Sequence, residues 1–306
     1  MRKQIVVVTA FLLLVAATPI CAQTPDQQLV DNAFPHELTG PNDPGAHSST
    51  YVTADLNHTG LPLLIALYTN GSRSAISVVD RAGQVVSHPS LPFLKGSGGE
   101  LELIDLDNDG TPEIIAQLYS GHGLNVPDTW VFAWRSGQLV LISPTGGRHN
   151  LQLSLLSQIA PVDVDGTGKL SLLAFPGVTQ DDDGNLVPKG TTKIYSLQNG
   201  QLKQASTQFT YAQWFSRRKS KPVTITRTFT GTPGATNLLV INDKTVTTAV
   251  DSARIVLNGA EVAHPSDFAP QTHVLTVPVT LVASNTLSVE VAGKPGAGIW
   301  VLVQSH

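Results

Sequence analysis

The sequence predicts an all-β protein, and three observations lead to this fold class. First, turn-forming residues are frequent, with 26 Gly and 20 Pro among 306 residues. Second, the apolar runs between these turns are crowded with β-branched side chains, which favour strands. Third, a pattern of apolar strand, acidic loop and apolar strand repeats along the chain. A chain of this length has room for two domains, and we expect repeated four-stranded sheets followed by a small β-sandwich.

Residues 1–22 have the features of a secretory signal peptide. Arg2 and Lys3 form a basic start, and Ile5 to Ala17 is an apolar stretch too short to span a bilayer. Small residues then offer a cleavage site near Ala22. We therefore expect a protein that is secreted, periplasmic or held at the cell surface.

The cysteine content and net charge of the mature chain limit the kinds of protein it can be. Cys21 is the only cysteine, and Ile20 before it is large where a lipoprotein signal needs a small residue, which disfavours a lipid anchor. The mature chain then has no disulfide and depends on core burial, sheet hydrogen bonds or metal. Removing residues 1–22 changes the formal net charge from −4 to −4 − 2 = −6, so no nucleic-acid partner is indicated. No other segment has the roughly 18 apolar residues of a transmembrane helix, so we expect no stable membrane span in the mature chain.

Residues 49–206 contain the repeat, after a polar leader of residues 23–48 in which we expect one short strand. Each unit has an apolar strand, an acidic loop, a second apolar strand, and two further strands joined by a tight turn that ends in Gly-Gln. The acidic loops begin at Asp55, Asp105 and Asp163, which are 50 and 58 residues apart. Four strands per unit at this period match one blade of a β-propeller. The expected blades are residues 49–100, 101–154 and 155–206.

The second acidic loop, residues 105–113, has the spacing of a Ca²⁺-binding loop. Ca²⁺ takes six to eight oxygen ligands at about 2.3–2.6 Å, and alternate residues of a tight loop can direct oxygens to one point. Gly110 permits the sharp turn. An EF-hand would need a Glu at loop position 12, but this position is Ala116 and the flanking segments read as strands. A solvated acidic turn is the alternative. The candidate ligands are Asp105, Asp107, Asp109, Thr111 through its carbonyl, and Glu113.

The first and third acidic loops carry fewer carboxylates. At the position of Glu113, the first loop has Leu63 and the third has Ser171. Fewer carboxylates give weaker Ca²⁺ binding, so we expect the second loop to bind best and the first worst. The candidate ligands are Asp55, Asn57 and Thr59 in the first loop, and Asp163, Asp165 and Thr167 in the third.

The repeat resembles the FG-GAP or VCBS repeats of integrin-α propellers and of many bacterial secreted proteins. The resemblance covers about residues 49–206 and is most specific at residues 105–113. It implies blades with a Ca²⁺ loop between their first two strands. It departs from the family in blade number, because three units are visible and the smallest closed propellers have four. We expect a short or partial β-propeller: either residues 27–48 and 207–217 form a degenerate fourth blade, or the sheets do not close into a ring.

Residues 222–306 have a different pattern, and a linker of residues 207–221 separates them from the repeat. Six or more strand-like runs with turns between them predict a small β-sandwich that folds on its own. The hairpin turn at Asn258–Gly259 and the runs around it resemble the galactose-binding-like jelly rolls attached to bacterial surface proteins and glycoside hydrolases. Trp300 alternates with apolar neighbours, which indicates a core position, with stacking on a sugar as the alternative.

Familiar catalytic motifs are absent from the sequence. It has no Gly-x-Ser-x-Gly elbow, no phosphate-binding glycine loop before a helix, and no His-Glu-x-x-His motif. A catalytic carboxylate pair can still meet in space. We expect a secreted or cell-surface Ca²⁺-binding protein that binds an extracellular glycan or protein without catalysis. The alternatives are an enzyme or enzyme subunit acting on polysaccharide, and a structural protein in which Ca²⁺ only braces the fold.

Overall fold

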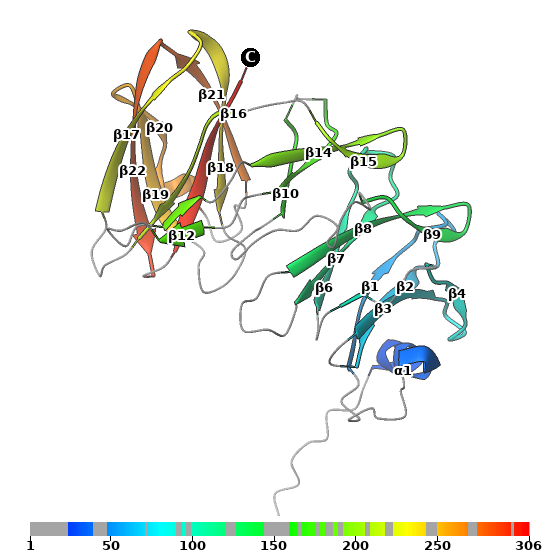
Figure 1. Ribbon diagram of the computed structural model, residues 1–306. Coiled ribbons are helices and arrows are strands. Elements are labelled where there is room, and N and C mark those ends of the chain that lie inside the picture. The colour runs from blue at the N-terminus through cyan, green and yellow to red at the C-terminus, as the bar shows by residue number, and fades with distance from the viewer. Residues whose placement is uncertain are drawn as a thin grey trace, which may run out of the picture.

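The fold is all-β, as the sequence predicts (Figure 1). Antiparallel sheets account for nearly all of the regular structure, and the exceptions among the described residues are one α-helix and two short 3-10 turns. No helix in this part of the chain is long and apolar enough to span a membrane. The structure, a computed structural model, describes residues 24–38, 48–70, 73–89, 94–95, 99–119, 127–143, 159–164, 167–174, 178–180, 186–188, 192–205, 209–217, 223–242, 250–268, 274–294 and 297–305.

Three antiparallel sheets follow one another along the chain, each with four strands in sequence order. The first sheet contains β1 (Ser48–Ala54), β2 (Leu63–Thr69), β3 (Arg73–Val79) and β4 (Val85–Ser87), with β5 (Leu94–Lys95) also paired to β3. The second contains β6 (Gly99–Ile104), β7 (Glu113–Tyr119), β8 (Pro127–Arg135) and β9 (Gln138–Leu141). The third contains β10 (Ile159–Val162), β11 (Ser171–Ala174), β14 (Lys193–Gln198) and β15 (Gln201–Gln204), and the hairpin of β12 (Val178–Gln180) and β13 (Leu186–Pro188) is inserted between β11 and β14.

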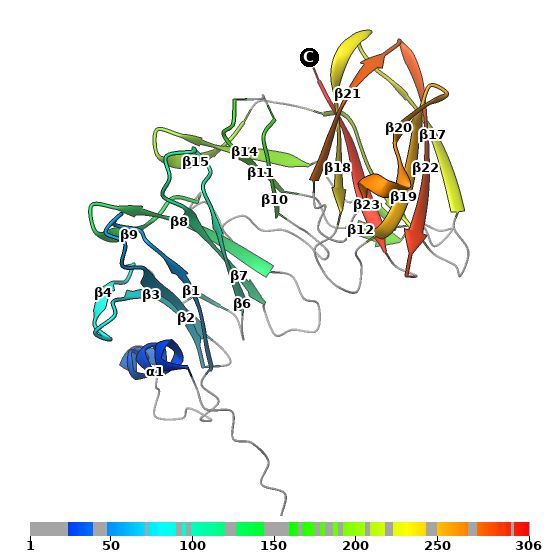
Figure 2. The same cartoon turned by 180° about the vertical axis from the view of Figure 1, so that it is seen from behind.

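The three sheets pack face to face in a row (Figures 1 and 2). Buried side chains of the first and second sheets share one core, which includes Ile65 and Phe132. The second and third sheets share another, which includes Ile115 and Leu172. The middle strands of all three sheets are therefore apolar on both faces, which accounts for the continuous apolar runs such as Leu63–Tyr68 in the sequence.

The polar leader was expected to hold a short strand, but its described residues 24–38 contain helices and no strand, and residues 39–47 lie outside the described residues. It forms α1 (Pro25–Asn32) and the 3-10 turn η1 (His36–Leu38). Thr24 caps the helix by accepting a hydrogen bond from Gln27 N, and Pro25 occupies the first turn, where its missing N–H costs nothing. Val30 and Leu38 are fully buried against the free face of the first sheet, so this segment covers one end of the row.

A two-layered β-sandwich follows the third sheet, which confirms the predicted sandwich. Its core lies between the two sheets and includes Phe215, Leu238, Ile255 and Leu287. The inner sheet, which faces the third sheet, contains β16 (Phe209–Ser216), β23 (Gly298–Gln304), β18 (Gly234–Asn242) and β21 (Val274–Leu281). The outer sheet contains β17 (Val223–Thr230), β22 (Ser284–Gly293), β19 (Val250–Leu257) and β20 (Ala260–Ala263), and η2 (Pro265–Asp267) follows β20.

The segment of residues 207–221, expected as a linker, instead contains β16, an edge strand of the inner sheet. β16 pairs with β23 along its length, and Trp214 and Phe215 are buried on opposite faces of the sheet. A fragment of residues 222–306 would therefore lack a strand of its own sandwich. Trp300 is 1% exposed and packs against Trp214 with ring centroids 5.7 Å apart, so it is a core residue, as favoured from the sequence.

The inner sheet is buried on its second face as well, because it packs against the third sheet of the row. Leu239, Trp300 and Leu302 share a core with Leu173 and Ile194 of the third sheet. Of the two expectations for closure, the degenerate fourth blade is wrong, since residues 25–38 form a helical cap and residues 209–216 belong to the sandwich. The row is open, and its two ends are covered by α1 and by the sandwich (Figures 1 and 2).

Candidate metal site

The three acidic loops have the same backbone design. In each, the first aspartate accepts hydrogen bonds from the backbone N–H groups at loop positions 5 and 6, and the glycine at position 6 has positive φ (+76°, +87° and +81°) that a side chain would disfavour. The donors are Thr59 (2.9 Å) and Gly60 (2.7 Å) to Asp55, Asp109 (3.1 Å) and Gly110 (2.9 Å) to Asp105, and Thr167 (3.1 Å) and Gly168 (2.9 Å) to Asp163.

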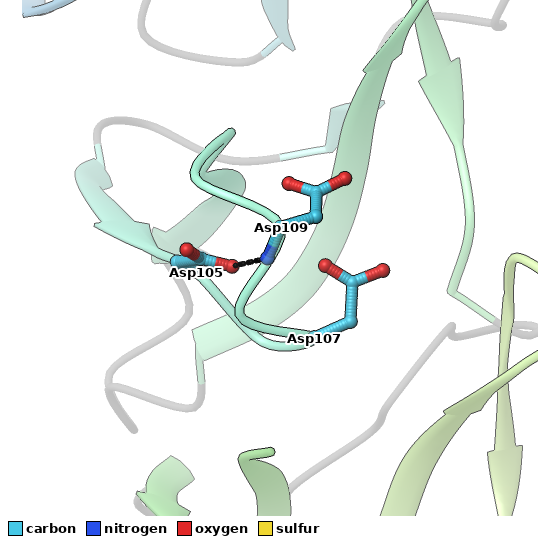
Figure 3. Close-up of side chains that lie close together, drawn as sticks. All are labelled: Asp105, Asp107 and Asp109. Atoms are coloured by element: carbon cyan, nitrogen blue, oxygen red, sulfur yellow. Dashed lines mark hydrogen bonds between the residues drawn. The ribbon is translucent and has the colours of Figure 1, made fainter. Parts of the chain in front are cut away.

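The second loop brings three carboxylates together. One oxygen from each of Asp105, Asp107 and Asp109 lies within 4.8 Å of the others. Figure 3 shows the side chains of Asp107 and Asp109 side by side, with that of Asp105 across the turn. Asp107 Oδ1 is buried and has no hydrogen-bond partner. Converging carboxylates with an unpaired buried oxygen fit a hard cation, and the donors are oxygens of the kind that Ca²⁺ prefers.

Glu113 lies beneath the loop rather than in the converging trio. Its side chain is 5% exposed, and Oε2 accepts a hydrogen bond of 2.9 Å from Leu106 N. Burial raises the pKa of Glu113 to about 7; the charges of Asp107 and Asp109 add to this increase, and the hydrogen bond from Leu106 opposes it. The structure thus gives this candidate ligand a role in holding the loop backbone.

Residues at the position of Glu113 in the other loops are buried too. Leu63 packs into the core between the first and second sheets, and the hydroxyl of Ser171 lies 2.8 Å from that of Ser196. The buried carboxylate is therefore a special feature of the second loop and not a requirement of the turn.

In the first loop, the candidate ligands contact the second sheet. The side-chain oxygen of Asn57 accepts a hydrogen bond of 2.7 Å from Trp134 Nε1, and His58 Nε2 lies 2.9 Å from the hydroxyl of Thr111. The hydrogen bond from Gly60 N is the main cause that lowers the pKa of Asp55. Among the described residues, no group of three acidic, His or Cys side chains converges around Asp55.

The third loop is described in part. Asp163 and Thr167 adopt the shared turn, with the Thr167 N–H directed at Asp163, whereas the candidate ligand Asp165 lies outside the described residues. Residues 1–22, the expected signal peptide, also lie outside them.

The residue at position 2 of each acidic loop was not singled out from the sequence. Its side chain packs between its own sheet and the next layer. Leu56, Leu106 and Val164 are buried in the cores shared with the second sheet, the third sheet and the inner sheet, respectively. Two of their carbonyls accept hydrogen bonds across these joints, of 2.8 Å from Leu170 N to Leu106 and 2.6 Å from Gln304 Nε2 to Val164. An apolar residue between two polar ones in every loop was the available signal.

A groove of about 640 Å³ lies on the sandwich between the edge strands β20 and β21. Its walls include Leu257, Val262 and Val279, and polar side chains are contributed by Asn237 and Asn258. None of the described residues that line it is aromatic, so these residues offer no stacking surface of the kind that often supports sugar binding.

No protein-family model matches the chain, and no curated protein does. Among solved structures, it is similar to an exo-β-1,3-galactanase from Phanerochaete chrysosporium, with 14% identity and a TM-score of 0.27 over 84% of this chain and 68% of that one. A β-fructofuranosidase from Bombyx mori gives 10% identity and a TM-score of 0.27, over 83% and 62% of the two chains. The structure of an M60 catalytic domain with two CBM51 domains from Clostridium perfringens gives 11% identity and a TM-score of 0.25, over 87% of this chain and 32% of that one. Scores this low establish neither a common fold nor a common activity.

Proposed function

We propose that this protein is a Ca²⁺-binding protein of the FG-GAP or VCBS type, a partial propeller of three blades followed by a jelly-roll sandwich, and that it acts outside the cell. The observation that carries this proposal is the convergence of Asp105, Asp107 and Asp109 in a turn whose backbone recurs in all three sheets. Four-stranded sheets with their strands in sequence order support the assignment as blades.

Calcium is the cation that best suits this loop. The converging donors are carboxylates and, by its place in the loop, the carbonyl of Thr111, and no His or Cys belongs to the cluster found among the described residues. Hard oxygen donors select Ca²⁺ or Mg²⁺ over Zn²⁺ and Cu²⁺. A surface loop that offers several oxygen ligands favours Ca²⁺, because Mg²⁺ demands a tighter octahedron and keeps most of its waters.

The proposed role is the non-catalytic binding of an extracellular glycan or protein. The loops connect paired strands, and both ends of the row are covered, so the row of sheets can serve as a platform for binding. The secretory signal expected at residues 1–22 places this platform where Ca²⁺ is abundant.

A second candidate function is that of an enzyme, or an enzyme subunit, acting on polysaccharide. The observation that favours it is Glu113, a carboxyl group whose pKa is raised to about 7 next to two further carboxylates, as in a general acid of glycoside hydrolysis. Its burial weighs against this role, because a side chain that is 5% exposed and bonded to Leu106 N cannot reach a glycosidic oxygen.

One set of measurements separates these functions. Calorimetric titration of wild type and Asp107→Asn with Ca²⁺ tests the cation site, and we expect binding that the substitution weakens strongly. A glycan array and a hydrolysis assay on the same glycans, each with EDTA and with Ca²⁺, then test the role. Binding without turnover supports the platform, turnover supports the enzyme, and Ca²⁺ binding with neither would leave a purely structural protein.

A further inference from the structure

Leu106 is held by the second loop on one side and by the third sheet on the other. Its N–H donates to Glu113 Oε2 (2.9 Å), and its carbonyl accepts from Leu170 N (2.8 Å). Its side chain is 1% exposed, in the core between the second and third sheets. Because Leu106 stands between Asp105 and Asp107 in the chain, a change of the loop backbone at either aspartate would also change this contact.

The three carboxylates strain the loop when no cation neutralises them. Like charges within 4.8 Å repel one another, and partial exclusion of water at Asp107 strengthens the repulsion. The buried, unpaired Asp107 Oδ1 has lost water without gaining a donor, which is an arrangement that a bound cation would complete. Opening the loop would relieve the repulsion, and it would also draw Leu106 away from Leu170.

We propose that cation binding in the loop of residues 105–113 regulates the joint between the second and third sheets. This inference rests on the proposed Ca²⁺ site and deepens it. The cation fixes Leu106 in the position that docks the third sheet and the sandwich onto the first two sheets. By thermodynamic reciprocity, the docked joint also raises the affinity of the loop for the cation.

The joint between the first and second sheets is an internal comparison. Leu56 is buried there to 3% exposure, as Leu106 is in its own joint. Its neighbours in the loop are one carboxylate, Asp55, and Asn57, whose oxygen is already bonded to Trp134. No acidic cluster among the described residues acts on this joint, and its contact with the second loop through His58 and Thr111 is exposed, so its stability should depend much less on Ca²⁺.

Hydrogen exchange measured by NMR on the full mature chain tests the inference directly. The Leu170 N–H reports the joint between the second and third sheets, and the Leu139 N–H, which donates to the Ser87 hydroxyl at 2.9 Å, reports the joint between the first and second. At ten times the Kd, Ca²⁺ should slow exchange at Leu170 about tenfold, the factor 1 + [L]/Kd, and leave Leu139 nearly unchanged. Equal slowing at both amides would overturn the inference, since Ca²⁺ would then stabilise the whole chain alike.

A matched pair of variants supplies the second readout. Leu56→Ala and Leu106→Ala each remove a buried leucine from a core between sheets and leave every candidate ligand in place, so both should lower the melting temperature. Only Leu106→Ala should weaken Ca²⁺ binding, by several-fold in calorimetry. Equal Ca²⁺ affinity in the two variants would contradict the proposed regulation of the joint but leave the proposed Ca²⁺ site standing. Absence of Ca²⁺ binding in wild type would contradict both proposals.

Discussion

The first and second acidic loops share a backbone but differ in charge. In both, an aspartate at position 1 binds the N–H groups of positions 5 and 6, and a glycine with positive φ occupies position 6. The first loop then has Asn57, Thr59 and Leu63 where the second has Asp107, Asp109 and Glu113.

The difference separates what the turn needs from what the second loop adds. The turn needs only one carboxylate, the aspartate at position 1, since the first loop forms with Asn57 and Thr59 in place of the other two aspartates. Of the remaining carboxylates of the second loop, Asp109 and Glu113 accept hydrogen bonds from Thr111 N and Leu106 N, whereas Asp107 Oδ1 is buried without a partner. Together these carboxylates add repulsion and a buried acid that the first loop does without, which is why we propose the cation for this loop.

The largest expected effect that separates the loops is the pH dependence caused by Glu113. The rise of its pKa from 4.5 to about 7 corresponds to about 3 kcal/mol at 1.36 kcal/mol per pH unit. Because the folded pKa is raised, the folded state holds the proton more tightly. The stabilisation is therefore complete below pH 4.5 and is lost as the pH rises through about 7. In EDTA, denaturant unfolding should show this decline in wild type and a clearly smaller one in Glu113→Gln.

Added Ca²⁺ provides the control for this pH dependence. A cation beside Asp107 and Asp109 offsets the negative charges that raise the pKa of Glu113, so the decline should become shallower at saturating Ca²⁺. If the stability of Glu113→Gln falls with pH as steeply as that of wild type in EDTA, another group is responsible. The two loops would then not differ through the ionisation of Glu113.

The next effect tests the shared backbone. Gly60 and Gly110 both have positive φ and nothing closer than about 4 Å to an added Cβ, so Gly60→Ala and Gly110→Ala should each cost about 1–2 kcal/mol through backbone strain alone. Chemical denaturation in EDTA is the measurement. A cost in one loop only would show that the two turns are less alike than their hydrogen bonds indicate.

The gain in folding stability from bound Ca²⁺ should be similar to the cost of the glycine substitutions or slightly smaller. At a Kd of about 10⁻⁴ M and Ca²⁺ of about 10⁻³ M, one site adds roughly 1.4 kcal/mol, from RT ln(1 + [L]/Kd). Melting curves with EDTA and with Ca²⁺ should show this gain in wild type and its loss in Asp107→Asn. Asn57→Ala should keep the gain although it melts lower, because it loses the hydrogen bond from Trp134. A gain that survives Asp107→Asn would place the cation elsewhere.

Much of the fold could be predicted because short sequence patterns mark each strand, loop and turn of the repeat. The acidic loops, the turns and the apolar strands recur in order, and each has a short-range physical cause. The helix α1 was missed because its composition is polar, although Thr24 followed by Pro25 is a helix start signal. β16 was missed because the basic residues Arg217, Arg218, Lys219 and Lys221 next to it suggested a linker. The alternation that buries Trp214 and Phe215 on opposite faces can be interpreted only when both partner sheets are known.

The site could be predicted as a set of residues but not as a geometry. Spacing identified Asp105, Asp107 and Asp109, which do converge, and it also selected Glu113, which lies below them. The role of Leu106 in the joint between two sheets depends on Leu170, which is more than 60 residues away in the sequence. Periodicity within one loop carries no information on such a distant partner.

The smallest expected effect concerns the contact between the two loops themselves. His58 Nε2 lies 2.9 Å from the hydroxyl of Thr111 on an exposed part of the surface, so the pair should contribute about 0.5–1 kcal/mol. A double-mutant cycle of His58→Ala and Thr111→Val isolates this coupling, because Thr111→Val keeps the carbonyl that is the candidate ligand. If the cation also orders the second loop, the coupling energy from urea unfolding should be larger in Ca²⁺ than in EDTA, since a fixed Thr111 loses less entropy on meeting His58. A coupling that is zero in both conditions would mean that the loops are neighbours without being partners, and the first loop would then take no part in the cation site.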